Sequence, residues 1–385
     1  MKLLIQHNHF QGEIAGVLTY IQSIEPELQR RGLETQTFST KETSPQQWLQ
    51  AIAQADLIHM NSNHLAFALL CKLLGKQVIL KYHYLFYLST HSTYEPMSLF
   101  QRLKTEFICS LPKRNYPLKW KLHTFVKLAR LATRFSTALV VDRQAACSQF
   151  LAQSHSFPWK VDTLYNPIHV VEDQSKKTID DLSKPFSFVY VGRLYKDKGV
   201  DLLLKATQIL RAKNQSANQS FEVLIIGDGG DAKELKTLAS KLEISDCIKF
   251  LGNYSQPDVL PVVRSALALV APSRWQEPAG YVTLEASSVQ TCSIVSQVGG
   301  LPEMAGPHNL FFEQENVEQL AAAMQICLDD PAAAIDRGRK ASHYVSERFS
   351  PENIVDQFLE IYQEMNPNSQ IDLTPNPLPE RARGL

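Results

Sequence analysis

Short apolar runs alternate with amphipathic, helix-length segments along the first 170 residues. The apolar run Leu3–Gln6 is followed by a glycine-containing loop and then by Val17–Arg31, whose apolar spacing predicts a helix. Further strands are predicted at Leu57–His59, Val78–Tyr82 and Ala138–Val141. Because strands and helices alternate, we expect a doubly wound, Rossmann-like α/β domain over residues 1–170.

A clearer series of strands follows a polar stretch at residues 172–184, where we place the domain boundary. The predicted strands are Phe188–Val191, Val223–Ile226, Ile248–Leu251, Ala266–Val270, Ser293–Ser296 and Leu310–Phe312, with helices between them. This pattern predicts a second Rossmann-like domain over residues 185–350. A helix over residues 351–366 should pack back across the domains, and the proline-rich residues 367–385 should form a disordered tail.

The composition is that of an ordinary globular protein, with 44% apolar and 20% charged residues in a chain of 385. The six cysteines include no CxxC pair, which favours reduced thiols in a cytosolic protein over a disulfide or zinc framework. The apolar stretch at the amino end is too short for a signal peptide, and no 18-residue apolar run occurs. We therefore expect a cytoplasmic protein.

The net charge of zero conceals an uneven distribution of charge along the chain. Residues 1–168 carry 18 Lys and Arg against 10 Asp and Glu, and the rest carries 21 against 29. Between Phe100 and Arg134 nine basic residues face one acidic residue, Glu106, and aromatic residues lie among them. One interpretation is that residues 100–134 contact an anionic acceptor or the inner face of a membrane. The other is that they form a solvated basic helix that packs on its own domain. No recognised nucleic-acid module accompanies the segment, so we expect no nucleic-acid partner.

The densest candidate site is the nine-residue segment from Glu277 to Glu285, directly after a predicted strand. A helix that begins near Ala279 would direct free backbone N–H groups toward the end of the sheet, where they can hold a diphosphate. Glu285 would then reach a ribose hydroxyl pair, and Glu277 would accept hydrogen bonds from sugar hydroxyls. Two glutamates at this spacing are, by themselves, equally typical of a solvated helix face.

Other predicted strands also end in residues suited to a phosphorylated ligand. Gly192 lets a ligand approach the backbone, and Arg193 and Lys198 would neutralise a departing diphosphate. A lone arginine and lysine are, by themselves, also typical of a solvated surface. Gly227 and Gly229 follow the next strand, as in a nucleotide-contacting loop or a plain turn. Gly299 and Gly300 precede Glu303 and suit a close approach beside the sugar.

These motifs, in this order and spacing, resemble retaining glycosyltransferases of the GT-B fold, specifically the large family 4. The resemblance rests on Val191–Leu194 with Lys198–Gly199, on Gly227–Gly229, on Glu277–Glu285 and on Gly299–Glu303, and covers roughly residues 1–365. It implies two Rossmann-like domains around a cleft, with the donor on the second and the acceptor, a glycan, lipid-linked or small molecule, on the first. It also implies that transfer of sugar from a nucleotide-diphosphate donor retains the anomeric configuration.

The resemblance assigns roles to individual residues. Arg193, Lys198, Glu277 and His83 would be catalytic. The donor would contact Gly16, Gly192, Gly227, Gly229, Gly280, Tyr281, Val282, Glu285 and Glu303. In the first domain, Gly16 matches the family's glycine loop and Asn166 the asparagine of a motif that ends the domain.

Three departures from the family pattern affect the identity of the donor sugar and leave the residues that would bind the diphosphate in place. Pro278-Ala279 replaces the usual aromatic residue, Asn166 is followed by Pro167-Ile168-His169, and Gln290-Thr291-Cys292 stands where Gly-x-Pro is expected. No Asp-x-Asp triad stands at a strand end, so we expect no metal and no cofactor beyond the nucleotide-sugar co-substrate. A sugar-nucleotide epimerase on the same fold, or a catalytically silent scaffold that binds anionic surfaces, remains an alternative.

Overall fold

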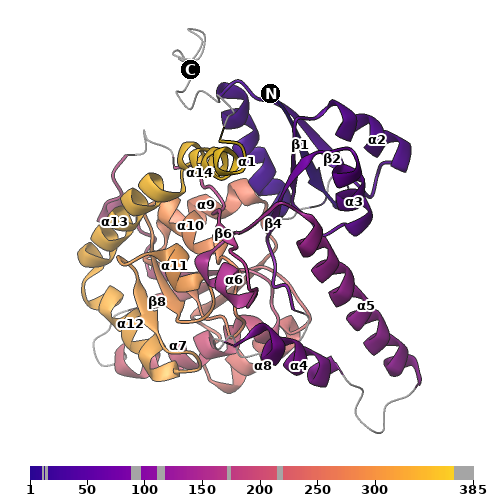
Figure 1. Cartoon of the computed structure of the whole chain (residues 1–385). Coiled ribbons are helices and arrows are strands. Elements are labelled where there is room, and N and C mark those ends of the chain that lie inside the picture. The colour runs from indigo at the N-terminus through magenta and orange to yellow at the C-terminus, as the bar shows by residue number, and fades with distance from the viewer. Residues whose placement is uncertain are drawn as a thin grey trace. The chain divides into compact units, whose positions relative to one another are not determined.

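The computed structural model describes residues 1–10, 13, 16–87, 97–110, 118–170, 175–214 and 220–367, and for Ser110, residues 118–124 and Gln256 the backbone alone. The described chain divides into two compact units. Unit 1 comprises Met1–Pro167 together with the C-terminal helix that begins at Pro351, and unit 2 comprises Ile168–Ser350. Figure 1 shows that strands in each unit are flanked by helices.

Unit 1 contains a parallel sheet in the order β2-β1-β3-β4-β5-β6, counted over its described residues. Its strands are β1 (Lys2–His7), β2 (Glu34–Ser39), β3 (Leu57–Met60), β4 (Gln77–Tyr82), β5 (Arg143–Ala146) and β6 (Asp162–Thr163). Its helices are α1 (Gly16–Arg30), α2 (Pro45–Gln54), α3 (Leu65–Leu73), α4 (Leu99–Ser110), α5 (Leu118–Val140), α6 (Gln149–Ser154) and α14 (Pro351–Met365). The predicted doubly wound domain is confirmed.

One strand predicted in unit 1 is wrong. Residues 138–141 lie at the end of helix α5 and just beyond it, and the strand is Arg143–Ala146. The apolar residues Ala138 and Val141 are buried at a helix terminus, which a short apolar run does not distinguish from a strand. The true strand contains Gln144, whose amide is satisfied by Tyr82 Oη at 2.9 Å and by the carbonyl of Ala138 at 2.7 Å.

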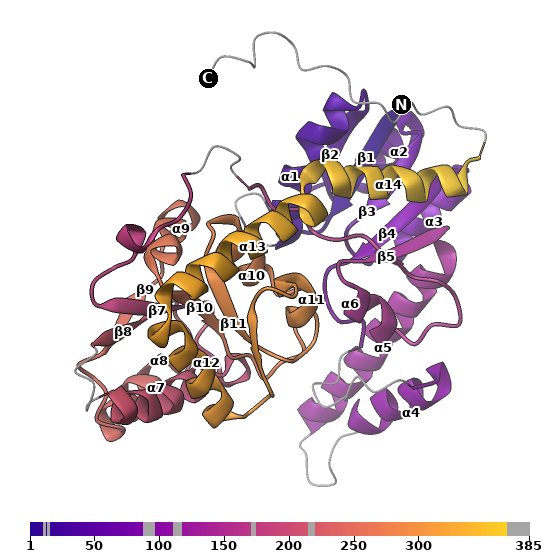
Figure 2. The ribbon, with the colours of Figure 1, turned by 90° about the vertical axis from the view of Figure 1, so that its left-hand side faces the viewer.

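Helix α14 packs on α1 within unit 1 (Figure 2). Arg31 joins the two helices, because its guanidinium lies 2.7 Å from Asp356 and 2.8 Å from Glu27. The ring of Phe358 lies 4.9 Å from that of His59 on β3. The C-terminal helix is therefore an integral part of the N-terminal unit.

Unit 2 contains a parallel sheet in the order β12-β11-β10-β7-β8-β9, again counted over described residues. Its strands are β7 (Phe186–Val191), β8 (Phe221–Ile226), β9 (Ile248–Gly252), β10 (Ala268–Ala271), β11 (Cys292–Ser296) and β12 (Leu310–Phe312). Its helices are η1 (Ile179–Asp181), η2 (Lys196–Lys198), α7 (Val200–Asn214), α8 (Ala232–Lys241), α9 (Gln256–Ser265), α10 (Tyr281–Ser288), α11 (Leu301–Ala305), α12 (Val317–Asp329) and α13 (Pro331–Phe349). All six strands predicted here are confirmed, with boundaries that differ by a few residues.

Alternate residues of β7 enter two apolar cores on opposite faces of this sheet. Phe188 and Tyr190 belong to the core that includes α7 and α12, and Val189 belongs to the core that includes α9 and α10. Burial of both faces explains the continuous apolar runs of these strands.

The strand order of unit 2 reverses between β7 and β10. The chain proceeds from β7 toward β8 on one side and from β10 toward β11 on the other. In open parallel sheets, ligands bind in the crevice that this reversal leaves at the carboxyl ends of the strands. Val191 and Ala271 end these two strands, so the loops that follow them frame the expected site. Within the described part of the chain, no helix is both long and apolar enough to cross a bilayer.

Candidate functional site

A pocket of about 250 Å³ opens at the strand-order reversal of unit 2. It is lined by Tyr190, Val191, Gly192, Arg193, Lys198, Ala271, Pro272, Ser273, Glu277, Gly280, Tyr281, Val282 and Leu301. The structure thus brings together seven of the residues predicted from sequence, namely Gly192, Arg193, Lys198, Glu277, Gly280, Tyr281 and Val282. They come from the loop after β7, the loop after β10 and the start of α10.

An ion pair between Lys198 and Glu277 spans two of these loops. Lys198 Nζ donates to Glu277 Oε1 at 2.5 Å, and Ser273 Oγ donates to the same oxygen at 3.0 Å. Both charged side chains are 16% exposed, and the ammonium lies 5.1 Å from the centre of the Trp275 ring. An ammonium group carries three donors, so Lys198 can hold Glu277 and an anionic ligand at once.

Arg193 lies at the exposed rim of the pocket. Its guanidinium lies 5.5 Å from the centre of the Tyr195 ring. Its carbonyl oxygen accepts a hydrogen bond of 2.8 Å from Tyr190 Oη. Burial raises the pKa of Tyr190, so the phenol stays protonated and holds the Arg193 backbone in place.

Helix α10 begins at the pocket rather than beside it. Gly280 is its N-cap residue, with φ of 60°, and a Cβ there would lie 2.5 Å from Leu301 Cδ2. A residue with a side chain would meet both a strained backbone and a clash. The positive end of the helix dipole is therefore directed at the space beside Lys198, which favours an anion.

Gly299 and Gly300 pack against the backbone of Glu277. Gly300 N donates to the Glu277 carbonyl at 2.7 Å, and Gly299 N donates to Gln276 Oε1 at 2.7 Å. A Cβ on Gly299 would lie 2.5 Å from the backbone nitrogen and oxygen of Glu277. These glycines permit the close packing of the loop that carries Glu277, and their approach to a sugar stays a prediction. Glu303 and Glu285, on α11 and α10, are partly buried and lie outside the pocket lining, so their contacts with a donor stay predictions.

Gly227 and Gly229 lie in the loop after β8 and pack against the loop after β7. A Cβ on Gly227 would lie 1.9 Å from the Gly192 carbonyl oxygen, and one on Gly229 would lie 2.3 Å from that of Leu194. Leu194 N donates to the Asp228 carbonyl at 2.9 Å. The pocket lining excludes both glycines, and their contact with a nucleotide stays a prediction.

His83 and Gly16 belong to unit 1. His83 Nε2 lies 2.9 Å from Asn61 Oδ1, and its ring centre lies 5.1 Å from that of Tyr20. Burial, followed by the charges of Lys81, His59 and His9, lowers the pKa of His83 well below its ordinary value, so the imidazole is neutral at pH 7. Gly16 is the first residue of α1. The catalytic role of His83 and the donor contact of Gly16 stay predictions.

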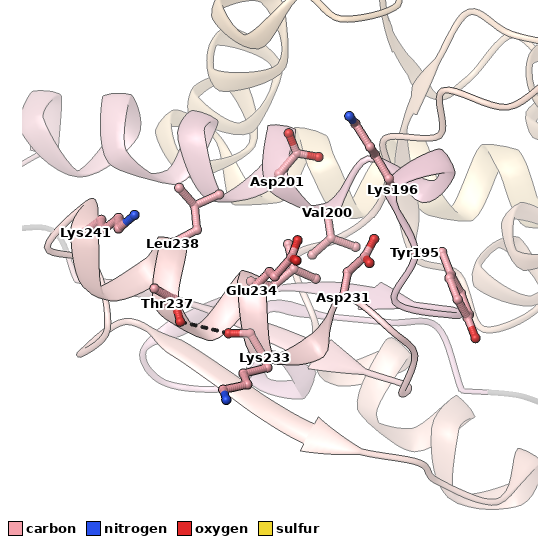
Figure 3. A pocket seen from close by; sticks show the side chains of 11 residues that line it. Tyr195, Lys196, Val200, Asp201, Asp231, Lys233, Glu234, Thr237, Leu238 and Lys241 are labelled. Atoms are coloured by element: carbon pink, nitrogen blue, oxygen red, sulfur yellow. Dashed lines mark hydrogen bonds between the residues drawn. The ribbon is translucent and has the colours of Figure 1, made fainter. Parts of the chain in front are cut away.

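A larger hollow, of about 580 Å³, lies between α7 and α8 (Figure 3). Among its lining residues, Lys196, Lys233 and Lys241 are balanced by Asp201, Asp231 and Glu234 over an apolar floor. A diphosphate requires an excess of positive charge, and this balance does not provide one. We therefore assign the candidate site to the smaller pocket at the strand ends.

Sequence reasoning missed Tyr190, Ser273, Arg274 and Trp275. Ser273 contacts Glu277 directly, and Arg274 and Trp275 donate from their backbone nitrogens to the Asp197 carbonyl at 2.8 and 3.0 Å. For Ser273, Arg274 and Trp275 the available signal was position alone, because they follow the strand β10 at the edge where ligands bind.

The second half of the chain matches a known family of enzymes. Residues 171–348 match the family model described as glycosyl transferases group 1. Two curated relatives match over 204 residues, or 51% of this chain. Glycogen synthase of Mycobacterium tuberculosis is 30% identical over 48% of its own length, and the D-inositol 3-phosphate glycosyltransferase of Rhodococcus opacus is 33% identical over 45%. The chain thus spans about half the length of the curated relatives it matches.

Solved structures match nearly the whole chain. The crystal structure of Anabaena HepE in complex with UDP superposes with a TM-score of 0.69 at 18% identity, covering 94% of this chain and all of that one. Sucrose-phosphate synthase from Thermosynechococcus elongatus superposes with a TM-score of 0.66 at 18% identity, covering 96% and 100%. At this identity the likeness concerns the fold, and it confirms the predicted GT-B architecture of two Rossmann-like domains.

Proposed function

We propose that this chain is a glycosyltransferase that binds a nucleotide-diphosphate sugar in the unit 2 pocket and transfers the sugar to a hydroxyl acceptor. The observation that carries the proposal is the convergence of Arg193, Lys198 and the amino end of α10 at one pocket on the strand-order reversal. Two fixed cations and a helix terminus suit a diphosphate. The group 1 match over the same unit supports this assignment.

In the proposed reaction the acceptor oxygen bonds to the anomeric carbon while the bond from that carbon to the diphosphate breaks. The electron pair of the broken bond remains on the diphosphate, which also receives the proton of the acceptor hydroxyl. Arg193 and Lys198 would stabilise the growing negative charge, and Glu277 would accept hydrogen bonds from the sugar. We place the enzyme in the retaining family 4. We expect Arg193 and Lys198 to stabilise the charge of the leaving diphosphate, a role that a metal ion fills in other transferases.

We further propose that unit 1 binds the acceptor and that residues 100–134 contact a membrane carrying it. The support comes from helix α4, whose outer face carries three exposed apolar side chains beside the exposed Gln101 and Lys104. Phe100, Phe107 and Ile108 are 78%, 51% and 55% exposed at helical spacing, whereas Arg102 and Glu106 on the inner face are 1% and 0% exposed. Exposed apolar patches of this kind mark interaction surfaces, and the excess of basic residues in the segment favours an anionic lipid surface. Residues 111–117 and the side chains of 118–124 lie outside the described part.

The test is thermal unfolding in the presence of UDP, GDP and ADP and their sugar conjugates, with Arg193→Ala and Glu285→Ala as variants. A ligand at 100 times its dissociation constant should add about 2.7 kcal/mol to the free energy of unfolding. One nucleotide should raise the midpoint of the wild type, and both variants should abolish the rise. If none of the nucleotides raises it, the chain is not a nucleotide-sugar enzyme and the scaffold alternative takes its place.

A further inference from the structure

Arg274, in the loop that follows β10, contacts the segment that follows β7 and the loop that follows β12. Its Nη1 and Nη2 donate to the two carboxylate oxygens of Asp201 at 2.5 and 2.8 Å. Nη1 also donates to the carbonyl of Lys196 at 2.9 Å, and Nε donates to Glu315 Oε1 at 2.5 Å. Every nitrogen of the guanidinium therefore has a partner, and the paired bonds to Asp201 have the bidentate geometry that only arginine provides.

The partners of Arg274 bracket Lys198 in the chain. Lys196 begins the short turn η2, which ends at Lys198, and Asp201 lies in the first turn of α7. The backbone nitrogen of Arg274 donates to the Asp197 carbonyl at 2.8 Å. Arg274 thus fixes the Lys198 backbone from both sides, although its own side chain lies outside the pocket lining.

Burial and charge indicate that this contact is strong. The Arg274 side chain is 17% exposed and that of Asp201 is 25% exposed. The hydrogen bond to Asp201 raises the pKa of Arg274. Burial alone would raise the pKa of Asp201, but the hydrogen bonds and charges of Arg274 and Lys205 lower it overall.

We propose that Arg274 and Asp201 form a positioning clamp that places the Lys198 ammonium for the diphosphate of the donor. The clamp rests on the proposed function, because it concerns the same pocket. Arg274 acts through Lys198. The Lys198 ammonium lies beside Glu277, which follows Arg274 in the same loop. The preference of the site for a nucleoside diphosphate over the monophosphate should depend on the clamp.

The experiment measures dissociation constants of UDP, GDP, ADP and the three monophosphates by calorimetry for the wild type and for Arg274→Lys, Lys198→Ala and the double variant. Arg274→Lys keeps the positive charge but loses the paired hydrogen bonds to Asp201. The diphosphate should therefore bind about tenfold more weakly, while the monophosphate affinity stays unchanged. The double variant should lose no more diphosphate affinity than Lys198→Ala alone, since Arg274 acts only through Lys198. Arg211→Lys is the matched control, because Arg211 pairs with Asp246 at the other end of α7.

The outcomes separate the two proposals. If the wild type binds none of the nucleotides, the proposed function fails and the clamp with it. If the wild type binds a diphosphate and Arg274→Lys keeps the full preference for it, the clamp alone is wrong. A loss of monophosphate affinity equal to that of the diphosphate would assign Arg274 a structural role only. Asp201→Asn, which preserves side-chain shape, provides the same comparison should Arg274→Lys fail to fold.

Discussion

The Lys198 ammonium and the Glu277 carboxylate neutralise each other across two loops of the unit 2 pocket, at 2.5 Å. A diphosphate that enters the pocket must share Lys198 with Glu277 and approach the negative charge of Glu277. The two members of the pair should therefore affect binding in opposite directions.

Lys198→Ala should weaken binding of the preferred nucleoside diphosphate by at least about tenfold, because it removes a cation and leaves Glu277 unpaired. Glu277→Gln should increase this affinity, because it removes a nearby negative charge and frees Lys198. Titration calorimetry with each variant measures the difference. Weaker binding in Glu277→Gln would mean that Glu277 orients Lys198 rather than competing for it.

Gly227→Ala should destabilise unit 2 by roughly 3 kcal/mol, because the new Cβ combines a positive φ with overpacking against the Gly192 carbonyl. Gly252→Ala is the control, since Gly252 also has a positive φ but nothing lies within 4 Å of its Cβ position. It should cost about 1 kcal/mol. Urea unfolding of both variants measures the two free energies, and equal values would contradict the packing role of Gly227.

The stability of unit 2 should increase with pH above neutrality because of Lys177. This lysine is 1% exposed, and its Nζ donates to the Ala266 carbonyl and to Thr291 Oγ1, both at 2.8 Å. Burial, followed by the charge of Arg264, lowers the pKa of Lys177 to about 7, whereas the unfolded chain keeps the proton until about pH 10.4. Unfolding between these values takes up a proton, so the free energy of unfolding rises with pH.

The measurement is urea unfolding at pH 7 and pH 9 for the wild type and Lys177→Met. The variant should lose the part of the pH dependence that Lys177 provides. Lys205→Met, at an exposed position of α7, should keep the wild-type increase. An identical increase in Lys177→Met would show that the buried amine does not titrate between the folded and unfolded states.

Phe107→Ser combined with Ile108→Ser should reduce binding to vesicles that contain phosphatidylglycerol by about thirtyfold, since each side chain is about half exposed and burying its exposed half contributes roughly 1 kcal/mol. Leu73→Ser, at an 82% exposed position of α3, should have no effect. Sedimentation with anionic and with neutral vesicles measures both the affinity and its dependence on charge. Equal binding by the wild type and the double variant would show that the outer face of α4 does not enter the bilayer.

The strands of unit 2 were predictable because both of their faces are buried, which leaves uninterrupted apolar runs such as Phe186–Val191. Strand β2, Glu34–Ser39, escapes this pattern because four of its six residues are polar and not fully buried. Strand β5 escapes it because its polar Gln144 is satisfied by partners from elsewhere in the chain.

The same distinction applies to the site. Glycines and charges near strand ends identified five residues of the pocket lining, since a strand end is a local feature, and the family resemblance added Tyr281 and Val282. Arg274 could not be identified in this way. Its partner Asp201 lies 73 residues away along the chain, and only the strand order brings the two together.

The placement of α14 determines the order in which the units can be completed during synthesis. Unit 2 is a continuous stretch, Ile168–Ser350, and all of its residues have been added to the growing chain before the first residue of α14. Unit 1 lacks the helix that packs on α1, and Arg31 lacks Asp356, until residues 351–365 have also left the ribosome. The N-terminal unit of this protein therefore cannot be completed until all of unit 2 has been synthesised.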